Sequence, residues 1–207
     1  MKTQTECMPC FMNQALRAAK TATDKDDQIW EALNKTGELL QHVKRNSIPA
    51  ETGEKVYRLV QDITGQNDLY ASEKQESIRE ALNLLPEIEK RIKNAPDPLM
   101  AAIRTAIAGN VIDFGVNKAF DLKKDWEQIF TQNFAAENYS SFKKKLAQAK
   151  NVLYIGDNAG ESVLDRVLIK QLKRPVKYAV REKPIINDLT YKEALESGLD
   201  KDAEIIS

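Results

Sequence analysis

Val152-Leu-Tyr-Ile-Gly-Asp-Asn-Ala-Gly-Glu161 is the stretch that decides the fold class of this 207-residue chain. Its first four residues, Val152–Ile155, form a short apolar run of strand-forming side chains before a glycine, and residues 162–172 then carry apolar side chains at helical spacing. This order predicts a buried strand, a tight turn and a helix. Because open parallel sheets bind ligands beyond the carboxyl ends of their strands, near helix N-termini, Asp157 and Asn158 are candidate site residues.

Two further strand-like runs follow, at residues 176–180 and 204–207, with helical patterns between them. This alternation is typical of an α/β domain with a parallel sheet. Apolar residues three and four apart predict earlier helices over residues 11–20, 28–43, 54–63 and 72–93. We therefore expect a helical N-terminal region over residues 1–95 and an α/β domain over residues 96–207.

A helix rich in small residues is predicted over residues 101–108, and we expect it to pack closely against the sheet. Asn110 and Asp113 follow it. They are consistent either with a helix C-cap and a turn or with polar residues of a site. Connecting helices are predicted over residues 125–130 and 139–150.

The composition excludes several classes of protein. An apolar content of 42% is enough to form a core, and the 31 basic residues balance the 31 acidic ones, so no overall charge favours nucleic acid or an anionic membrane. No apolar run is long enough to cross a membrane, and the N-terminal residues lack the apolar segment of a signal peptide. We expect a soluble, cytoplasmic protein.

The two cysteines, Cys7 and Cys10, have the spacing Cys-x-x-Cys. Such a pair can form half of a zinc site or a redox dithiol, but a structural zinc site needs four ligands. The only histidine, His42, lies in a predicted helix. A pair of thiols packed at a helix start remains the alternative to a metal or redox role.

A second polar cluster, Arg181-Glu-Lys-Pro-Ile-Ile-Asn-Asp188, follows the second predicted strand. If the first two strands are parallel neighbours, Asp157, Asn158 and Asp188 converge at one edge of the sheet. Two carboxylates and an amide are oxygen ligands that suit Mg²⁺ or Mn²⁺. Lys183 could bind a phosphate in the same crevice.

Each of these residues also has a purely structural interpretation. Asp157 and Asn158 could form an N-cap arrangement, Glu161 could be a favourable acidic residue in a first helical turn, and Asn187-Asp188 could cap a helix that starts near Thr190. Asp165 shares a helix face with Glu161, where two carboxylates repel mildly; this pairing is tolerable in solvent and becomes useful near a cation.

Taken together in order, these motifs resemble the metal-dependent damage-control phosphatase family, formerly a domain of unknown function. The resemblance is carried by the segments Gly156–Glu161 with Asp165-Arg166, Lys183–Asp188, Gly109–Asp113 and Cys7–Cys10. It covers nearly the whole chain and is strongest for the prokaryotic and archaeal members with paired cysteines.

The resemblance implies a three-layer α/β/α, Rossmann-like fold with a helical N-terminal region. It also implies hydrolysis of phosphate monoesters of small metabolites, either sugar phosphates or damaged phosphorylated metabolites. The implied cofactor is a divalent ion (Mg²⁺, Mn²⁺, Co²⁺ or Ni²⁺) on Asp157, Asn158 and Asp188, with Asp157, Asn158 and Lys183 in catalysis. The implied substrate contacts come from Asn110, Asp113, Gly160, Glu161 and Lys183.

The chain ends at Ser207 within a predicted strand, where family members continue. We therefore expect a shortened form of the fold, whose exposed sheet edge a homodimer could cover. The main alternative function is a non-catalytic module that binds a nucleotide or phosphometabolite. A dinucleotide enzyme is disfavoured because Gly156 and Gly160 do not form Gly-x-Gly-x-x-Gly, and a metal requirement would disfavour a methyltransferase.

Overall fold

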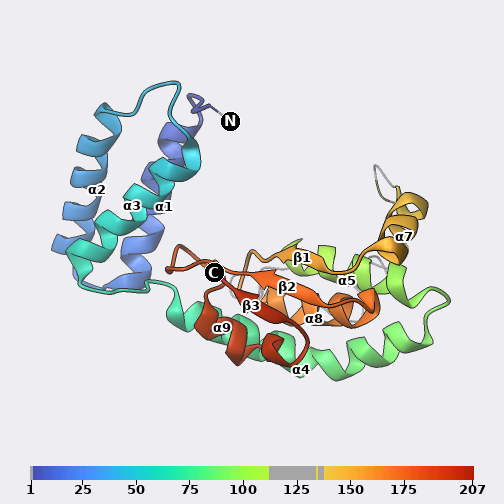
Figure 1. The fold of residues 1–207 in the computed structure, drawn as a ribbon. Coiled ribbons are helices and arrows are strands. Elements are labelled where there is room, and N and C mark those ends of the chain that lie inside the picture. Colours follow the sequence, from blue (N-terminus) through green and yellow to red (C-terminus); the bar gives the residue numbers. More distant parts are fainter. Residues whose placement is uncertain (1, 112–133, 135–137) are drawn as a thin grey trace. The chain divides into compact units, whose positions relative to one another are not determined.

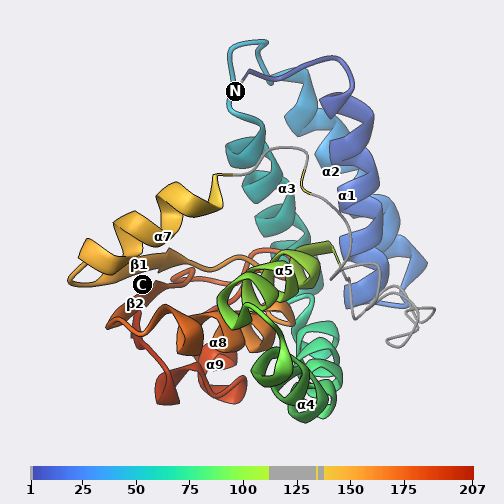
Figure 2. The same cartoon turned by 90° about the vertical axis from the view of Figure 1, so that its right-hand side faces the viewer.

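The computed structural model describes residues 2–111, 134 and 138–207, and its contacts divide the chain into two units (Figures 1 and 2). The first unit contains residues 2–71 and the short segment Pro184–Ile186, and the second contains Ser72–Lys183 and Asn187–Ser207. The helices are α1 (Cys7–Ala22), α2 (Asp26–Gln41), α3 (Pro49–Thr64), α4 (Ala71–Asn94), α5 (Pro98–Val111), α7 (Tyr139–Gln148), α8 (Glu161–Leu172), α9 (Tyr191–Glu196) and the 3-10 turn η1 (Leu199–Lys201). The strands are β1 (Val152–Ile155), β2 (Val176–Ala179) and β3 (Glu204–Ile206).

The first unit is a bundle in which α1, α2 and α3 all contact one another. Small residues of α1, among them Ala15, Ala18 and Ala19, are fully buried and allow the helices to approach closely. Pro49 is at the start of α3. Proline is well suited there because the first helical turn does not need its N–H as a donor.

Helix α4 belongs mainly to the second unit, because the division falls at Ala71. The sequence analysis placed its boundary at residue 95, beyond this helix. Ile78, Ala81, Ile88 and Ile92 of α4 are buried in the same apolar cluster as residues of α8 and the strands. The helical part of the chain therefore supplies one element of the α/β core.

The three strands form a parallel sheet in the order β1-β2-β3, which confirms the predicted α/β class (Figure 1). The expectation of a fully buried first strand was wrong. β1 lies at an edge of this sheet and alternates in burial, with Leu153 and Ile155 62% and 77% exposed. Its other side chains, Val152 and Tyr154, pack on the core, as expected for alternating strand residues.

Helix α5 packs closely against α8 (Figure 2), and its Ala101, Ala102 and Ala108 belong to the same buried apolar cluster as Val176 and Tyr178 of β2. Its small residues allow the close approach to α8. A Cβ added at Gly109 would lie 3.0 Å from a side-chain carbon of Leu164. This packing places the last turn of α5 beside the first turn of α8. No helix in the described part of the chain is long and apolar enough to cross a membrane.

Candidate functional site

The loops after β1 and β2 are joined by backbone hydrogen bonds. Asn158 and Asp188 form an isolated antiparallel bridge, the Leu189 N–H donates to the Asp157 carbonyl (2.7 Å), and the Ala159 N–H donates to the Asn187 carbonyl (3.0 Å). The predicted ligand residues Asp157, Asn158 and Asp188 are therefore brought together at the carboxyl ends of neighbouring strands. This backbone pairing, and not only strand adjacency, sets their positions.

The end of α5 supplies a third segment to this site. The Asn110 side-chain amide donates to Glu161 Oε2 (3.0 Å) and to Asp157 Oδ2 (3.4 Å). A side chain that donates to two carboxylates on other elements does more than terminate its own helix. Asp113, which the sequence analysis assigned to the same cleft, lies outside the described residues.

The N-caps of α8 and α9 test whether Asp157, Asn158 and Asp188 serve only to cap helices. The N-cap of α8 is Gly160, and no side chain caps it. The N-cap of α9 is Thr190, which forms a capping box with Glu193. Asp157, Asn158 and Asp188 are therefore not needed as helix caps in this structure.

Charges within the cluster influence one another. Burial raises the pKa of Glu161, and the negative charge of Asp157 raises it further, whereas hydrogen bonds from Asn110 and Asn158 act in the opposite direction. Burial and the Asp157 charge also raise the pKa of Asp188, against the lowering effect of Arg181 and Lys74. The site therefore concentrates negative charge in a partly desolvated position.

Arg181 was not predicted as a site residue, yet its Nε lies 2.8 Å from Asp188 Oδ2. The predicted cation, Lys183, lies exposed on the loop between β2 and Asp188. The same loop holds Ile186 at a φ of 49°, a left-handed conformation that is unfavourable for a β-branched residue. Strained backbone of this kind is found where the surrounding structure fixes a functional loop.

Lys74 was also missed by the sequence analysis. Its side chain is fully buried, with Nζ 3.1 Å from Glu193 Oε1, and its charge acts on Asp188. Burial tends to raise the pKa of Glu193, but the Thr190 hydrogen bonds and the Lys74 charge outweigh this effect and lower it. Glu193 therefore stays ionised and pairs with Lys74 behind the Asp188 loop.

Asp165 is the third missed residue. The sequence predicted it on one helix face with Glu161, a pairing tolerable in solvent or useful near a cation, and the structure shows that Asp165 is fully buried. It accepts hydrogen bonds from the hydroxyls of Tyr154 and Tyr178, each at 2.5 Å. The signal that could have found it is the tyrosine at an inward position on each of two neighbouring strands, since a buried hydroxyl needs a partner.

Oxygen donors dominate the candidate metal set. Among the described residues, no three or more His, Cys, Asp and Glu side chains are arranged as a metal-holding group. The predicted ligand set Asp157, Asn158 and Asp188 is not such a group, because Asn158 contributes an amide. Burial is the main cause of the raised pKa of Asp188, and the negative charge of Asp157 adds to it; a nearby cation would favour the ionised form of both carboxylates. Asp157, Asn158 and Asp188 could thus hold a hard divalent ion, with water completing its coordination.

Two other features lie in the helical unit. Cys7 and Cys10 are free thiols in the first turn of α1, where Cys7 packs against the buried cluster that contains Phe11. The role of the cysteines stays open.

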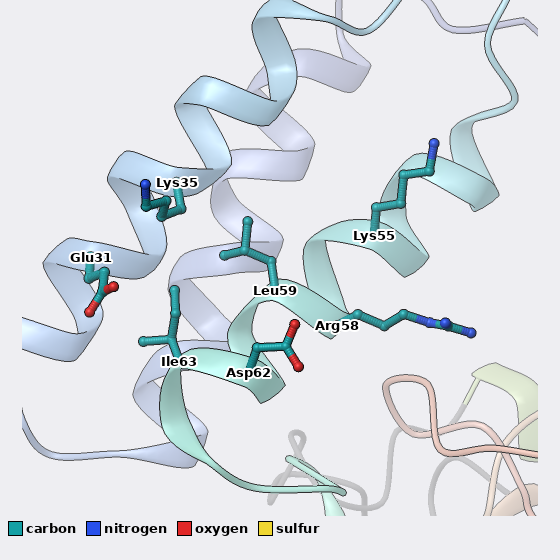
Figure 3. A pocket seen from close by; sticks show the side chains of 7 residues that line it. All are labelled: Glu31, Lys35, Lys55, Arg58, Leu59, Asp62 and Ile63. Carbon is teal, nitrogen blue, oxygen red and sulfur yellow. The ribbon is translucent and has the colours of Figure 1, made fainter.

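A surface hollow between α2 and α3 is lined by seven side chains, all labelled in Figure 3, and most of them are charged. Both positive and negative groups line it, as on an ordinary solvated surface.

Comparison with known proteins places these segments in a family. Residues 3–207 match the damage-control phosphatase ARMT1-like domain. A damage-control phosphatase of Pyrococcus horikoshii is 31% identical over the whole chain, which spans 73% of that protein, and one of Archaeoglobus fulgidus is 29% identical over 99% of the chain and 73% of its own length. An uncharacterized protein of Methanocaldococcus jannaschii is 31% identical, with 71% of its length covered.

The fold agrees with this relationship. A crystal structure of a DUF89 family protein from Pyrococcus horikoshii superimposes with a TM-score of 0.90 and 30% identity, covering 100% of this chain and 74% of that one. The match extends through both the helical unit and the sheet unit. From the matched domain and these relatives together, the chain belongs to the damage-control phosphatase family.

Proposed function

We propose that this protein is a divalent-metal-dependent phosphatase that hydrolyses phosphate monoesters of small metabolites, such as sugar phosphates or damaged phosphorylated metabolites. Membership of the damage-control phosphatase family supports the phosphatase activity. The observation that carries the rest is the backbone pairing of the two loops, which gathers Asp157, Asn158 and Asp188 at one sheet edge. Carboxylate and amide oxygens in this place suit a divalent ion and a phosphate.

In this proposal, Asp157, Asn158 and Asp188 hold the ion. When bound, it supplies polarisation of a phosphoryl oxygen and compensation of the charge on the leaving oxygen. Arg181 engages one oxygen of Asp188, so the other oxygen of that carboxylate is the one available as a ligand. The buried Lys74 lowers the electrostatic cost of keeping Asp188 ionised.

The remaining residues bind and orient the phosphate. Glu161 has a raised pKa, so in its protonated form it can donate a hydrogen bond to a phosphate oxygen. Asn110, which contacts both Glu161 and Asp157, orients these two side chains. Gly160 is the N-cap of α8, where backbone N–H groups favour an anion, and Lys183 adds a positive charge from the exposed loop.

The test is phosphate release by the purified chain from a panel of sugar phosphates and other phosphate monoesters. Each substrate is assayed with Mg²⁺, Mn²⁺, Co²⁺ and Ni²⁺ in turn, and with excess chelator as the control. We expect release with at least one metal and none with chelator. Release that persists in chelator would contradict the metal requirement. A protein that binds the panel without releasing phosphate would instead be a non-catalytic phosphometabolite-binding module.

A further inference from the structure

Asp165 is a buried carboxylate that the proposed mechanism does not use. It lies on α8 one helical turn after Glu161, on the side of the helix that faces the sheet, and is fully buried. The Tyr154 hydroxyl donates to its Oδ1 and the Tyr178 hydroxyl to its Oδ2. Burial raises the pKa of both tyrosines, so both retain the protons that they donate.

This cluster lies directly beneath the candidate site. The rings of Tyr154 and Tyr178 stack, with centroids 5.0 Å apart and planes 10° from parallel. The Tyr178 ring fills the space under Gly156, where an added Cβ would lie 2.2 Å from ring atom Cε1. Gly156 immediately precedes Asp157, so the tyrosine that holds Asp165 also supports the backbone of a proposed metal ligand.

A buried carboxylate is costly unless positive charge compensates it. In the described part of the chain, the hydrogen-bond partners of Asp165 are two neutral hydroxyls. The charges with the largest effect on its pKa are those of the carboxylates Glu161 and Asp157. Helix α5 also packs against α8, but its charged residue, Arg104, lies over the Phe134 ring at 4.8 Å. A cation at the site above would supply the compensating charge.

We propose that Asp165 is a positioning residue whose buried negative charge strengthens binding of the divalent ion at Asp157, Asn158 and Asp188. This inference rests on the proposed function, because it needs the metal site. Its physical basis is that a fixed charge in a weakly polarisable interior acts on a nearby cation more strongly than a solvated charge does. Tyr154 and Tyr178 contribute by hydrogen bonding to the ionised form of the carboxylate.

The direct test is the dissociation constant of Mn²⁺, measured by calorimetry and by the electron paramagnetic resonance signal of free Mn²⁺ at pH 8. We expect Asp165→Asn to weaken binding on the order of tenfold, from the loss of one nearby buried charge. Asp202→Asn is the matched control. Asp202 is also a mostly buried carboxylate, but Arg166 (2.7 Å) already compensates its charge. The Asp202→Asn variant should bind Mn²⁺ as tightly as the wild type does.

A second variant keeps the test decisive if Asp165→Asn does not fold. Tyr178→Phe keeps the ring beneath Gly156 and removes one hydroxyl donor, so Asp165 should lose its proton less readily. Burial, opposed by the two tyrosine hydrogen bonds, already raises the pKa of Asp165 to about 7. We therefore expect weaker Mn²⁺ binding by Tyr178→Phe than by the wild type at pH 7, with a smaller difference at pH 8.

Tyr57→Phe, which removes a buried hydroxyl from the helical unit, should bind normally at both pH values. Wild-type affinity in both Asp165→Asn and Tyr178→Phe would overturn the role of Asp165 while leaving the metal site intact. A wild-type protein that binds no Mn²⁺ would overturn the metal site, and the role of Asp165 with it.

Discussion

The two units of this chain bury different kinds of polar residue. In the part of the chain that the structure describes, the buried polar side chains of the helical unit are threonines, whereas the α/β unit also buries Lys74, Asp165, Arg166 and Glu193. The helical unit keeps its ion pairs on the surface, as in Arg58–Glu54. Burying charge costs free energy, so buried charges concentrated in one unit indicate that they serve a function other than stability there.

The location of these charges suggests the purpose. Lys74 and Glu193 lie behind the Asp188 loop, and Asp165 lies beneath Gly156 and Asp157. These three residues belong to structures that support a proposed metal ligand, whereas Arg166 pairs with Asp202. The helical unit has amphipathic helices whose charged faces are solvated, and its hollow in Figure 3 has the same character. The comparison therefore separates a scaffold for chemistry from a helical bundle stabilised by apolar packing.

The largest expected effect tests the buried ion pair. Lys74→Met should lower the free energy of unfolding by about 3–5 kcal/mol, because it leaves Glu193 buried without its ammonium partner. Urea denaturation followed by circular dichroism measures this. The matched control is Arg58→Met, which breaks the exposed pair with Glu54 and should cost less than about 1 kcal/mol. Equal losses in the two variants would mean that the two units do not differ in this respect.

The next effect concerns the pH dependence of stability. Burial raises the pKa of Asp165 from 3.8 to about 7. The stability that the protonated group contributes is fully present below about pH 4 and is lost as the pH rises through about 7. Relative to Asp165→Asn, the wild type should lose up to about 4 kcal/mol of unfolding free energy over this range.

Denaturation of both proteins at several pH values between 4 and 8 provides the measurement. Asp188 titrates in both proteins, so its contribution largely cancels in the difference, whereas part of the Glu161 contribution is coupled to Asp165. The prediction requires that the difference in unfolding free energy between the wild type and Asp165→Asn changes with pH. Parallel stability curves for the wild type and Asp165→Asn would show that Asp165 has an ordinary pKa.

The smallest of the three effects compares two glycines. Gly156→Ala should destabilise the fold by about 1–3 kcal/mol, because the new methyl group would overlap the Tyr178 ring. Gly37→Ala, inside α2 of the helical unit, meets no atom within 4 Å and should stabilise the protein by about 0.5–1 kcal/mol. Thermal unfolding distinguishes the signs. Stabilisation by both substitutions would contradict the close packing beneath Gly156.

Local patterns allowed much of the fold to be predicted. The order of strands and helices from Val152 onward and the amphipathic helices of the first half follow from periodicity within short windows, and the structure confirms them. Asp157, Asn158 and Asp188 were predicted as neighbours because polar residues after apolar runs mark strand ends, and the structure brings their loops together. The parallel order then required only that consecutive strands be neighbours.

The supporting residues could not be found in this way, because their roles depend on distant partners. Lys74 has an ordinary helical context, and only the fold brings it to Glu193. Asp165 reads as one of two carboxylates on a helix face, and its burial depends on which side of α8 meets the sheet. The exposure of Ile155 was missed because an apolar run does not show which strand is at an edge.

The measurement that tests the central claim most directly is metal-dependent phosphate release by Asp157→Asn, compared with Asp62→Asn in the hollow of the helical unit (Figure 3). Both variants remove one carboxylate charge, but only Asp157 belongs to the proposed metal set. We predict that Asp157→Asn abolishes release and that Asp62→Asn retains the wild-type rate. Wild-type activity in a folded Asp157→Asn protein would contradict the assignment of the site.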